Sequence, residues 1–275
     1  MQTQGFRQTE TDKLILQDEA LDYRVLNLAS NTFNENNTAY WHKSVGGYHA
    51  AKLRRYQEMI EEHISGEMNG LFKAVADAGG DMELLNPADF PVLNMLNTRY
   101  FIFPLQGGQT VPLDNPFALG NAWFVDEVEY VGNANEEIEA IHGLDPTQTA
   151  IVDKKFESVI KSLPSDSTAT IELVAYEPNY LRYEVSSEKG GTVVFSEIYY
   201  PGWKSTIDGQ EVEHGRANYI LRAMNVPAGK HVVEFRFDPD SLHVTENIAF
   251  IALGLLVLLA IATIVLKIKA CRKAE

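Results

Sequence analysis

Cysteine is almost absent from this sequence of 275 residues, and the single one, Cys271, lies near the C-terminus. The chain before it folds without disulfide bonds, which suits an oxidising compartment without requiring one. Basic residues are also scarce, since 23 Lys and Arg stand against 38 Asp and Glu. Residues 247–275 hold four of the basic and one of the acidic residues, so the head, residues 1–246, has 19 basic and 37 acidic ones. Such a head repels phosphate backbones, and we expect no nucleic-acid partner.

Motifs of catalytic and cofactor sites are missing as well. There is no glycine-rich phosphate loop ending in Lys-Ser/Thr, no G-x-S-x-G turn and no H-E-x-x-H motif. His42, His49 and His63 follow one another at seven and fourteen residues, which is not a short zinc-ligand spacing. The scattered carboxylates give no distinct glycosidase pair. We predict no catalytic residue, no metal site and no cofactor.

A long apolar run occurs near the C-terminus. Residues 248–266 carry no charge, and Thr263 is the one polar side chain among them. At about 1.5 Å per residue the run spans nearly the ~30 Å core of a bilayer, and it lacks the polar stripe of a soluble helix. We predict a juxtamembrane segment over 241–247, a transmembrane helix over 248–268 and a cytoplasmic tail over 269–275.

The charges around this run predict its orientation. Lys267, Lys269, Arg272 and Lys273 follow the run, and the positive-inside rule places them in the cytoplasm and the head outside it. The opening MQTQGFRQTETDK has no apolar stretch and is not a signal peptide. Either the chain is anchored by its tail with a cytoplasmic head, or further membrane spans precede it. The charge pattern favours the second arrangement, with an upstream transmembrane region.

Patterning divides the head into two domains after a polar linker over residues 1–20. Residues 21–165 mix strand and helix patterns, which predicts a mixed α/β domain. Its expected strands are 23–28, 99–103, 122–131 and 150–152, and its expected helices are 47–65, 70–78, 92–97 and 136–142.

Residues 166–240 carry only short strand patterns with close turns. The strands are expected at 170–176, 180–186, 191–198, 203–207, 219–225 and 231–237, with turns at Asp208-Gly209 and Pro227-Ala228-Gly229. This pattern is typical of a β-sandwich. The predicted fold class is therefore α+β, with a mixed α/β domain, an all-β sandwich and one C-terminal transmembrane helix.

A basic, glycine-containing stretch predicts an anion site. Basic residues in the first turns of a helix oppose its dipole, whereas an anion bound at the helix start would be stabilised by the free N–H groups there. The expected site, for a lipid phosphate, comprises Lys43, Gly46, Gly47, His49, Lys52 and Arg55, on a helix beginning near Gly47. The alternative is a solvated amphipathic helix whose arginines pair with distant carboxylates.

Aromatic residues gather around Pro201-Gly202. Tyr199, Tyr200 and Trp203 present ring faces that can stack on sugars, which predicts a carbohydrate site. The alternative is a packed corner with Trp203 in the sandwich core, since large aromatic side chains usually bury.

From residue 22 onward the chain resembles the C-terminal part of bacterial YfhO-family membrane proteins. The resemblance rests on DYRVLNLASNTFNENNTAYWHKSVGGYHAAKLRRYQEMIEEHI, PVLNMLNTRYFI and SEIYYPGWKSTIDGQEVEHGRANYILRAMNVPAGKHVVEFRFDP. The Tyr-Pro-Gly-Trp corner at 200–203 is its most specific piece. Family members resemble multi-span glycosyltransferases that use lipid-linked sugars, and they are implicated in glycosylating envelope polymers such as lipoteichoic acid. Their catalytic carboxylates are expected in an early extracytoplasmic loop, so no catalytic residue carries over.

The resemblance implies a function and a location. The chain would be the extracytoplasmic region of a protein in the cytoplasmic membrane of a bacterium, non-catalytic by itself. Its partners would be the membrane and a lipid-linked sugar or an envelope glycan. Two alternatives stay open, a membrane-anchored carbohydrate-binding module and an anchored hydrolase.

Overall fold

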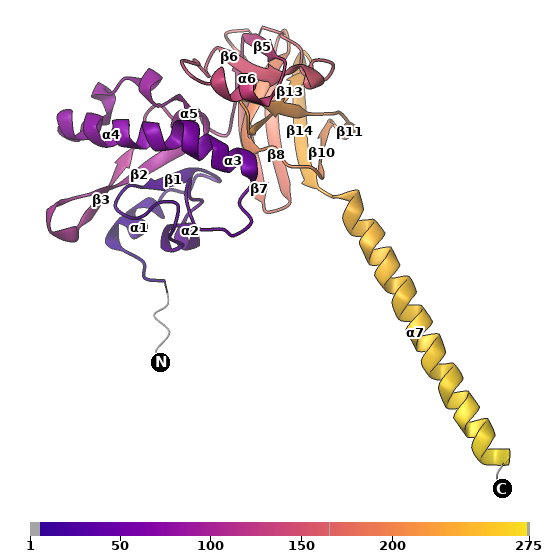
Figure 1. Ribbon diagram of the computed structural model, residues 1–275. Coiled ribbons are helices and arrows are strands. Elements are labelled where there is room, and N and C mark those ends of the chain that lie inside the picture. The colour runs from indigo at the N-terminus through magenta and orange to yellow at the C-terminus, as the bar shows by residue number, and fades with distance from the viewer. Residues whose placement is uncertain (1–5, 165, 274–275) are drawn as a thin grey trace.

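The computed structural model describes residues 6–164 and 166–273 of the chain. It has a head with two parts side by side, and a long helix that extends away from it (Figure 1). Helices and short strands fill the first part, and two packed sheets fill the second. The α+β class is confirmed.

The first part is built on a three-stranded sheet. β1 (Arg24–Asn27) pairs in parallel with β2 (Thr98–Pro104), which pairs antiparallel with β3 (Thr110–Asp114). A parallel pair needs a long crossover, and the chain between β1 and β2 supplies it. The crossover carries α2 (Asn37–Trp41), α3 (Arg54–Met59), α4 (Ser65–Asp77) and α5 (Pro91–Met95).

The predicted linker over residues 1–20 is in part folded. It contains α1 (Glu10–Ile15), which begins with a capping box of Thr9 and Asp12. Ile15 is buried, and the Thr11 hydroxyl donates to the carbonyl of Thr110 beside β3. These contacts fix α1 on the first sheet.

One continuous helical rod replaces the two helices expected at 47–65 and 70–78. The rod consists of α3, a π-helical segment (Ile60–Ile64) and α4. Both predicted boundaries are wrong, because the rod begins at Arg54 and continues through Gly66 and Gly70. Each glycine costs roughly 1 kcal/mol in a helix, but the buried face that includes Leu71 carries the helix past them.

The second part is a sandwich of two antiparallel sheets. The strand order is β11-β10-β14-β8-β7 in one sheet and β12-β13-β9-β4 in the other. The six strands predicted after residue 166 are all present, with ends that differ by at most two residues. They are β7 (Thr170–Glu177), β8 (Tyr180–Ser187), β9 (Gly191–Ile198), β10 (Trp203–Ile207), β13 (Leu221–Val226) and β14 (Gly229–Phe237), joined by the short β11 (Gln210–Glu211) and β12 (Gly215–Ala217).

The predicted strand over 122–131 is two strands in different sheets. β4 (Ala122–Val125) is the edge strand beside β9, whereas β5 (Glu127–Val131) pairs in parallel with β6 (Thr149–Asp153) across α6 (Ala134–Glu139). The sandwich therefore includes β4, which lies before the domain boundary expected at residue 165.

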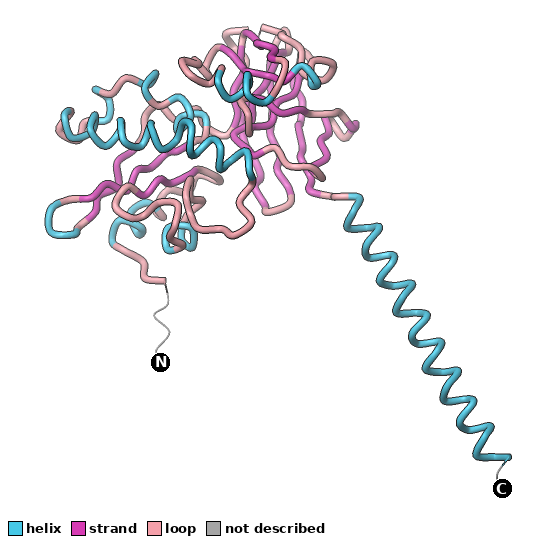
Figure 2. The backbone as a smooth tube through the Cα atoms, in the orientation of Figure 1, coloured by secondary structure: helices cyan, strands magenta, loops and turns pink. Residues whose placement is uncertain are grey.

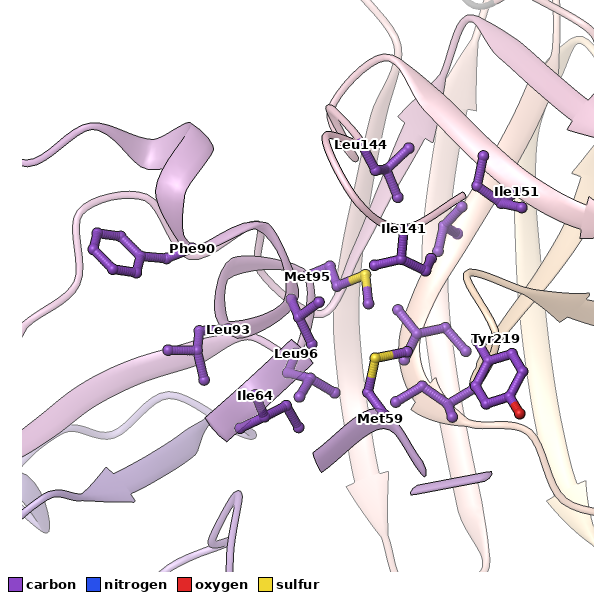
Figure 3. Close-up of a cluster of buried hydrophobic side chains, with 14 of the residues drawn as sticks. Met59, Ile64, Phe90, Leu93, Met95, Leu96, Ile141, Leu144, Ile151 and Tyr219 are labelled. Atoms are coloured by element: carbon purple, nitrogen blue, oxygen red, sulfur yellow. The ribbon is translucent and has the colours of Figure 1, made fainter. Parts of the chain in front are cut away.

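One buried hydrophobic cluster runs through both parts of the head. Figure 3 shows Met59 and Ile64 of the rod meeting Leu96, Ile141 and other side chains from both parts. A further cluster fills the sandwich, where the rings of Tyr183, Phe195 and Phe235 meet edge to face. Because the first cluster is shared, the two parts pack as one body.

The last helix, α7 (Asp240–Lys273), begins directly after β14 and extends away from the head (Figure 2). Its apolar side chains are exposed, and the helix is long and apolar enough to cross a membrane, with a mean hydropathy of 3.0 over its most apolar stretch. The predicted transmembrane helix over 248–268 lies within it, as do the juxtamembrane residues 241–247.

Candidate functional site

Three adjoining pockets form a groove that begins at the junction of the two parts and continues over the sandwich. The basic pocket, of about 510 Å³, includes Lys43, Lys52 and Glu197. The arginine pocket, of about 310 Å³, includes Arg54, Arg55 and Arg216. The aromatic pocket, of about 660 Å³, includes Tyr199, Trp203 and His214. The basic and arginine pockets share Leu53, Tyr56 and Ile198, and the arginine and aromatic pockets share Tyr199, Tyr200 and Pro201.

The groove therefore brings together both sites predicted from the sequence. Lys43, Gly46, Gly47, His49 and Lys52 line the basic pocket, Arg55 lines the arginine pocket, and Tyr199, Tyr200 and Trp203 line the aromatic pocket.

The lining of the groove is basic although the head is acidic. Eight basic side chains line it, against three acidic ones. They are Arg24, Lys43, Lys52, Arg54, Arg55, Lys155, Lys204 and Arg216, against Glu197, Glu211 and Glu213. Six of the eight form ion pairs, whereas Arg24 and Lys52 have no carboxylate partner in the described part of the chain. Arg24 and Arg216 are buried, so the cations of the lining that reach solvent are the other six.

Lys43 is held by two carboxylates. Its Nζ lies 2.8 Å from Asp22 Oδ2 and 2.6 Å from Glu197 Oε1. Burial lowers the pKa of Lys43 and raises that of Asp22, while Lys43 and Arg24 outweigh burial and hold the pKa of Glu197 below its usual range. Asp22 belongs to the first part and Glu197 to β9, so this network joins the two parts of the head.

The glycines of the predicted anion site serve a loop. A Cβ on Gly46 would lie 2.1 Å from the carbonyl oxygen of Thr32, and Gly47 has φ +98°. The Gly47 N–H donates to the same carbonyl at 2.7 Å. The prediction that a helix begins near Gly47 is wrong, because the chain continues as a loop with a turn at residues 50–51 until α3 begins at Arg54. The dipole argument therefore does not apply to Lys43, His49 or the glycines.

Lys52 and His49 lie on the rim of the basic pocket. The Lys52 Nζ lies 5.5 Å from the centre of the Phe33 ring, and His49 Nδ1 accepts a hydrogen bond from the Ala51 N–H. Among the described residues, no carboxylate forms an ion pair with Lys52, whereas Lys43 of the same pocket has two carboxylate partners. Lys52 is the residue of the predicted anion site best placed to meet a ligand.

Arg55 takes part in a buried ion network. Glu137 of α6 is completely buried, and it accepts two hydrogen bonds from Arg216 of β12, at 2.7 and 3.2 Å, and one from Arg55 at 3.1 Å. The Arg55 guanidinium also stacks 4.3 Å from the centre of the Tyr219 ring. These hydrogen bonds hold the guanidinium groups of Arg55 and Arg216 in place at the groove, and they connect α3, β12 and α6.

The aromatic corner combines packing with exposure. Trp203 stacks on the buried guanidinium of Arg222, at 4.0 Å from ring centre to Cζ, and also contacts Phe237. Tyr200 is 46% exposed, and Tyr199 is partly buried against Phe156. Trp203 thus belongs to the sandwich packing and to the pocket lining at once.

This corner touches the start of α7. The Asp238 N–H donates to the carbonyl of Gly202, and Lys204 bridges Asp238 and Asp240 at 3.1 and 2.9 Å. Gly202 has φ +98°, and a Cβ there would lie 2.8 Å from Cβ of Pro239. The aromatic pocket therefore opens beside the root of the apolar helix.

Sequence reasoning missed Arg222 and His214. Arg222 is 2% exposed, its Nη1 has no hydrogen-bond partner, and burial lowers its pKa to about 10. Burial likewise lowers the pKa of His214 to about 4. Neither stands in a local motif, and both acquire their environment from strands that pair at a distance.

Over residues 6–164 and 166–273, no three His, Cys, Asp or Glu side chains come together as a possible metal site. The searches of curated proteins and of solved structures gave no match. Residues 144–249 match the family described as bacterial membrane protein YfhO. The matched region contains most of the sandwich, the aromatic corner and the first turns of α7. This match supports the resemblance seen in the sequence, and over residues 144–249 the chain is similar to the YfhO family of bacterial membrane proteins.

Proposed function

We propose that the head is the extracytoplasmic ligand-binding region of a YfhO-family membrane protein. Its groove binds the anionic sugar end of a lipid-linked sugar, and it serves the glycosylation of cell-envelope polymers. Binding is the role of this chain, and the transfer step needs groups outside the groove.

The observation that carries the proposal is the course of the groove. Cations line one end, sugar-stacking aromatic side chains line the other, and that second end touches the start of the membrane-spanning helix. A lipid-linked sugar has a phosphate, a sugar ring and an acyl chain that stays in the bilayer. The groove offers a matching surface for the first two within reach of the third.

The orientation belongs to the same proposal. Four basic residues within residues 267–273 follow the apolar run, which supports a cytoplasmic tail and a head outside the cytoplasmic membrane. A head on that side meets envelope polymers directly.

Binding to the full chain in lipid nanodiscs tests the proposal. The probes are polyprenyl-phosphate glucose, polyprenyl phosphate and a neutral glucolipid of equal chain length. Lys52→Gln should weaken binding of both phosphate probes about tenfold, since a hydrogen bond to a charged group contributes roughly 1.5–3 kcal/mol. Lys73→Gln, at an exposed position on α4, is the matched control. Failure of all probes to bind, or equal binding by the two variants, would overturn the proposal.

A second function is favoured by the aromatic pocket. With about 660 Å³ it is larger than the basic pocket, and Tyr200 stands exposed on it. A membrane-anchored carbohydrate-binding module would use this end alone and would bind a soluble envelope polysaccharide. Tyr200→Ala would then abolish polysaccharide binding, while Lys52→Gln would leave it unchanged.

A further inference from the structure

Ser205 and His214 form a hydrogen-bonded pair in the aromatic pocket. Ser205 lies on β10, and His214 directly precedes β12. The Ser205 Oγ lies 2.5 Å from the carbonyl oxygen of Val212 and 2.8 Å from Nδ1 of His214. Both side chains line the pocket that the proposed function assigns to a sugar.

The two distances place the protons of the pair. A carbonyl oxygen only accepts, so an O···O separation of 2.5 Å requires the serine hydroxyl to donate to Val212. The hydroxyl has a single proton, and its remaining lone pairs accept. Nδ1 of His214 must therefore carry a hydrogen and donate it to Ser205 Oγ.

The groups around His214 keep the ring neutral. Its ring packs against Tyr199 and Phe235, and Arg222 is the charged group that acts on it from β13. Burial first and the Arg222 charge second lower the pKa of His214, which opposes a second proton on the ring. Glu211 and Glu213 line the same pocket without a bond to the ring among the described residues.

A neutral imidazole with a hydrogen on Nδ1 has a bare Nε2, which is an acceptor. No residue in the described part of the chain bonds to His214 Nε2, and this atom is not among the fully buried unpaired atoms. The atom therefore keeps some exposure to solvent, and the side chain that carries it lines the aromatic pocket.

We propose that Nε2 of His214 is a specificity determinant that accepts a hydrogen bond from a hydroxyl group of the bound sugar. The inference rests on the proposed function and extends it to the sugar ring, the uncharged part of the ligand's head group. An acceptor at this place selects a free hydroxyl, so a deoxy or O-methyl sugar is rejected there, and a carboxylate is repelled. Ser205 is a positioning residue, because its oxygen accepts the Nδ1 hydrogen of His214 and so fixes the tautomer.

The tautomer is measurable without any ligand. In the full chain labelled with ¹⁵N-histidine and held in nanodiscs at pH 7, His214 should show a protonated Nδ1 and an unprotonated Nε2. Assignment comes from the spectrum of His214→Asn, which lacks these signals. A hydrogen on Nε2 of the wild type would overturn the inference.

Binding of polyprenyl-phosphate glucose tests the role of Nε2. The amide nitrogen of His214→Asn can take the place of Nδ1 and keep the bond to Ser205, whereas nothing replaces Nε2. We expect binding about tenfold weaker for His214→Asn, the size of one hydrogen bond that leaves a buried partner unpaired. Ser205→Ala should weaken binding as well, because it frees the tautomer. His231→Asn, whose histidine lies on β14 outside the groove, is the matched control.

A series of monodeoxy glucose probes separates direct contact from packing. Removal of the hydroxyl at one position of the sugar should weaken binding to the wild type about tenfold. The same removal should not weaken binding to His214→Asn any further, because both changes remove the same hydrogen bond. If His214→Asn bound the probe with the same affinity as the wild type, this inference would be overturned and the proposed function would stand. Absence of binding to the wild type would overturn both.

Discussion

Removing Glu137 should destabilise the head more than removing any exposed carboxylate. The side chain is completely buried, with Arg216 and Arg55 as its hydrogen-bond donors. Glu137→Ala leaves Arg216, itself nearly buried, with Asp153 at 3.6 Å as its remaining carboxylate. Breaking a buried pair in this way costs about 3–5 kcal/mol. At about 2–4 °C per kcal/mol for a domain of this size, Tm should fall by roughly 10 °C.

Thermal unfolding of the full chain in nanodiscs measures this effect. Glu139→Ala, at an exposed position on the same helix, is the control and should change the free energy of unfolding by less than about 0.5 kcal/mol. Arg55→Gln should lower the free energy of unfolding of the wild type. In the Glu137→Ala background it should have almost no effect, because both substitutions remove the same hydrogen bond. A Tm for Glu137→Ala equal to that of the control would refute the reasoning, and so would additive losses in the double variant.

Three further predictions concern topology, backbone strain and pH. Protease added to spheroplasts should degrade the head and spare a C-terminal tag, as the positive-inside rule predicts from the basic residues after the apolar run; a protected head would contradict the proposed orientation. Gly202→Ala should lower stability by about 2 kcal/mol, because a Cβ there meets Pro239 and φ is positive; a neutral effect by chemical denaturation would refute the contact. The pKa of His214 is about 4 in the folded state, so below its unfolded value of 6.5 the unfolded chain takes up the proton first. Stability should therefore fall by up to roughly 3 kcal/mol between pH 6.5 and pH 4, and His214→Asn should lose less over that interval. Parallel acid titrations that coincide for wild type and variant would exclude this role of His214.

Local patterns in the sequence determined the sandwich and the membrane helix. Short strand patterns bounded by turn signals predicted β9 and β10, and Asp208-Gly209, with φ of 51° and 78°, makes the expected tight turn into β11. The absence of charge in 248–266 was enough to predict a spanning helix. Such features depend on neighbouring residues, so a single sequence carries them.

The start of α3 and the division of 122–131 were decided by tertiary contacts. Gly46 lies against Thr32 in a loop, and the chain does not become helical until Arg54. The strand pattern runs without a break from β4 into β5, yet β4 joins β9, some 70 residues further along the chain. Neither partner is visible in the local pattern, because strand pairing depends on where the rest of the chain folds.

The candidate site shows the same division. The sequence supplied the residue types, six for an anion and three aromatic side chains for a sugar, and the structure placed all nine along one groove. Only the tertiary structure showed that Lys43 and Arg55 are engaged with Glu197 and Glu137, which leaves Lys52 as the unpaired cation among them. It also showed the hydrogen bond between His214 and Ser205 of β10, on which the inferred proton arrangement of His214 rests. Ion pairs and hydrogen bonds form between side chains that are close in space. The ion-pair partners found here are far apart in the sequence, so only the folded structure identifies them.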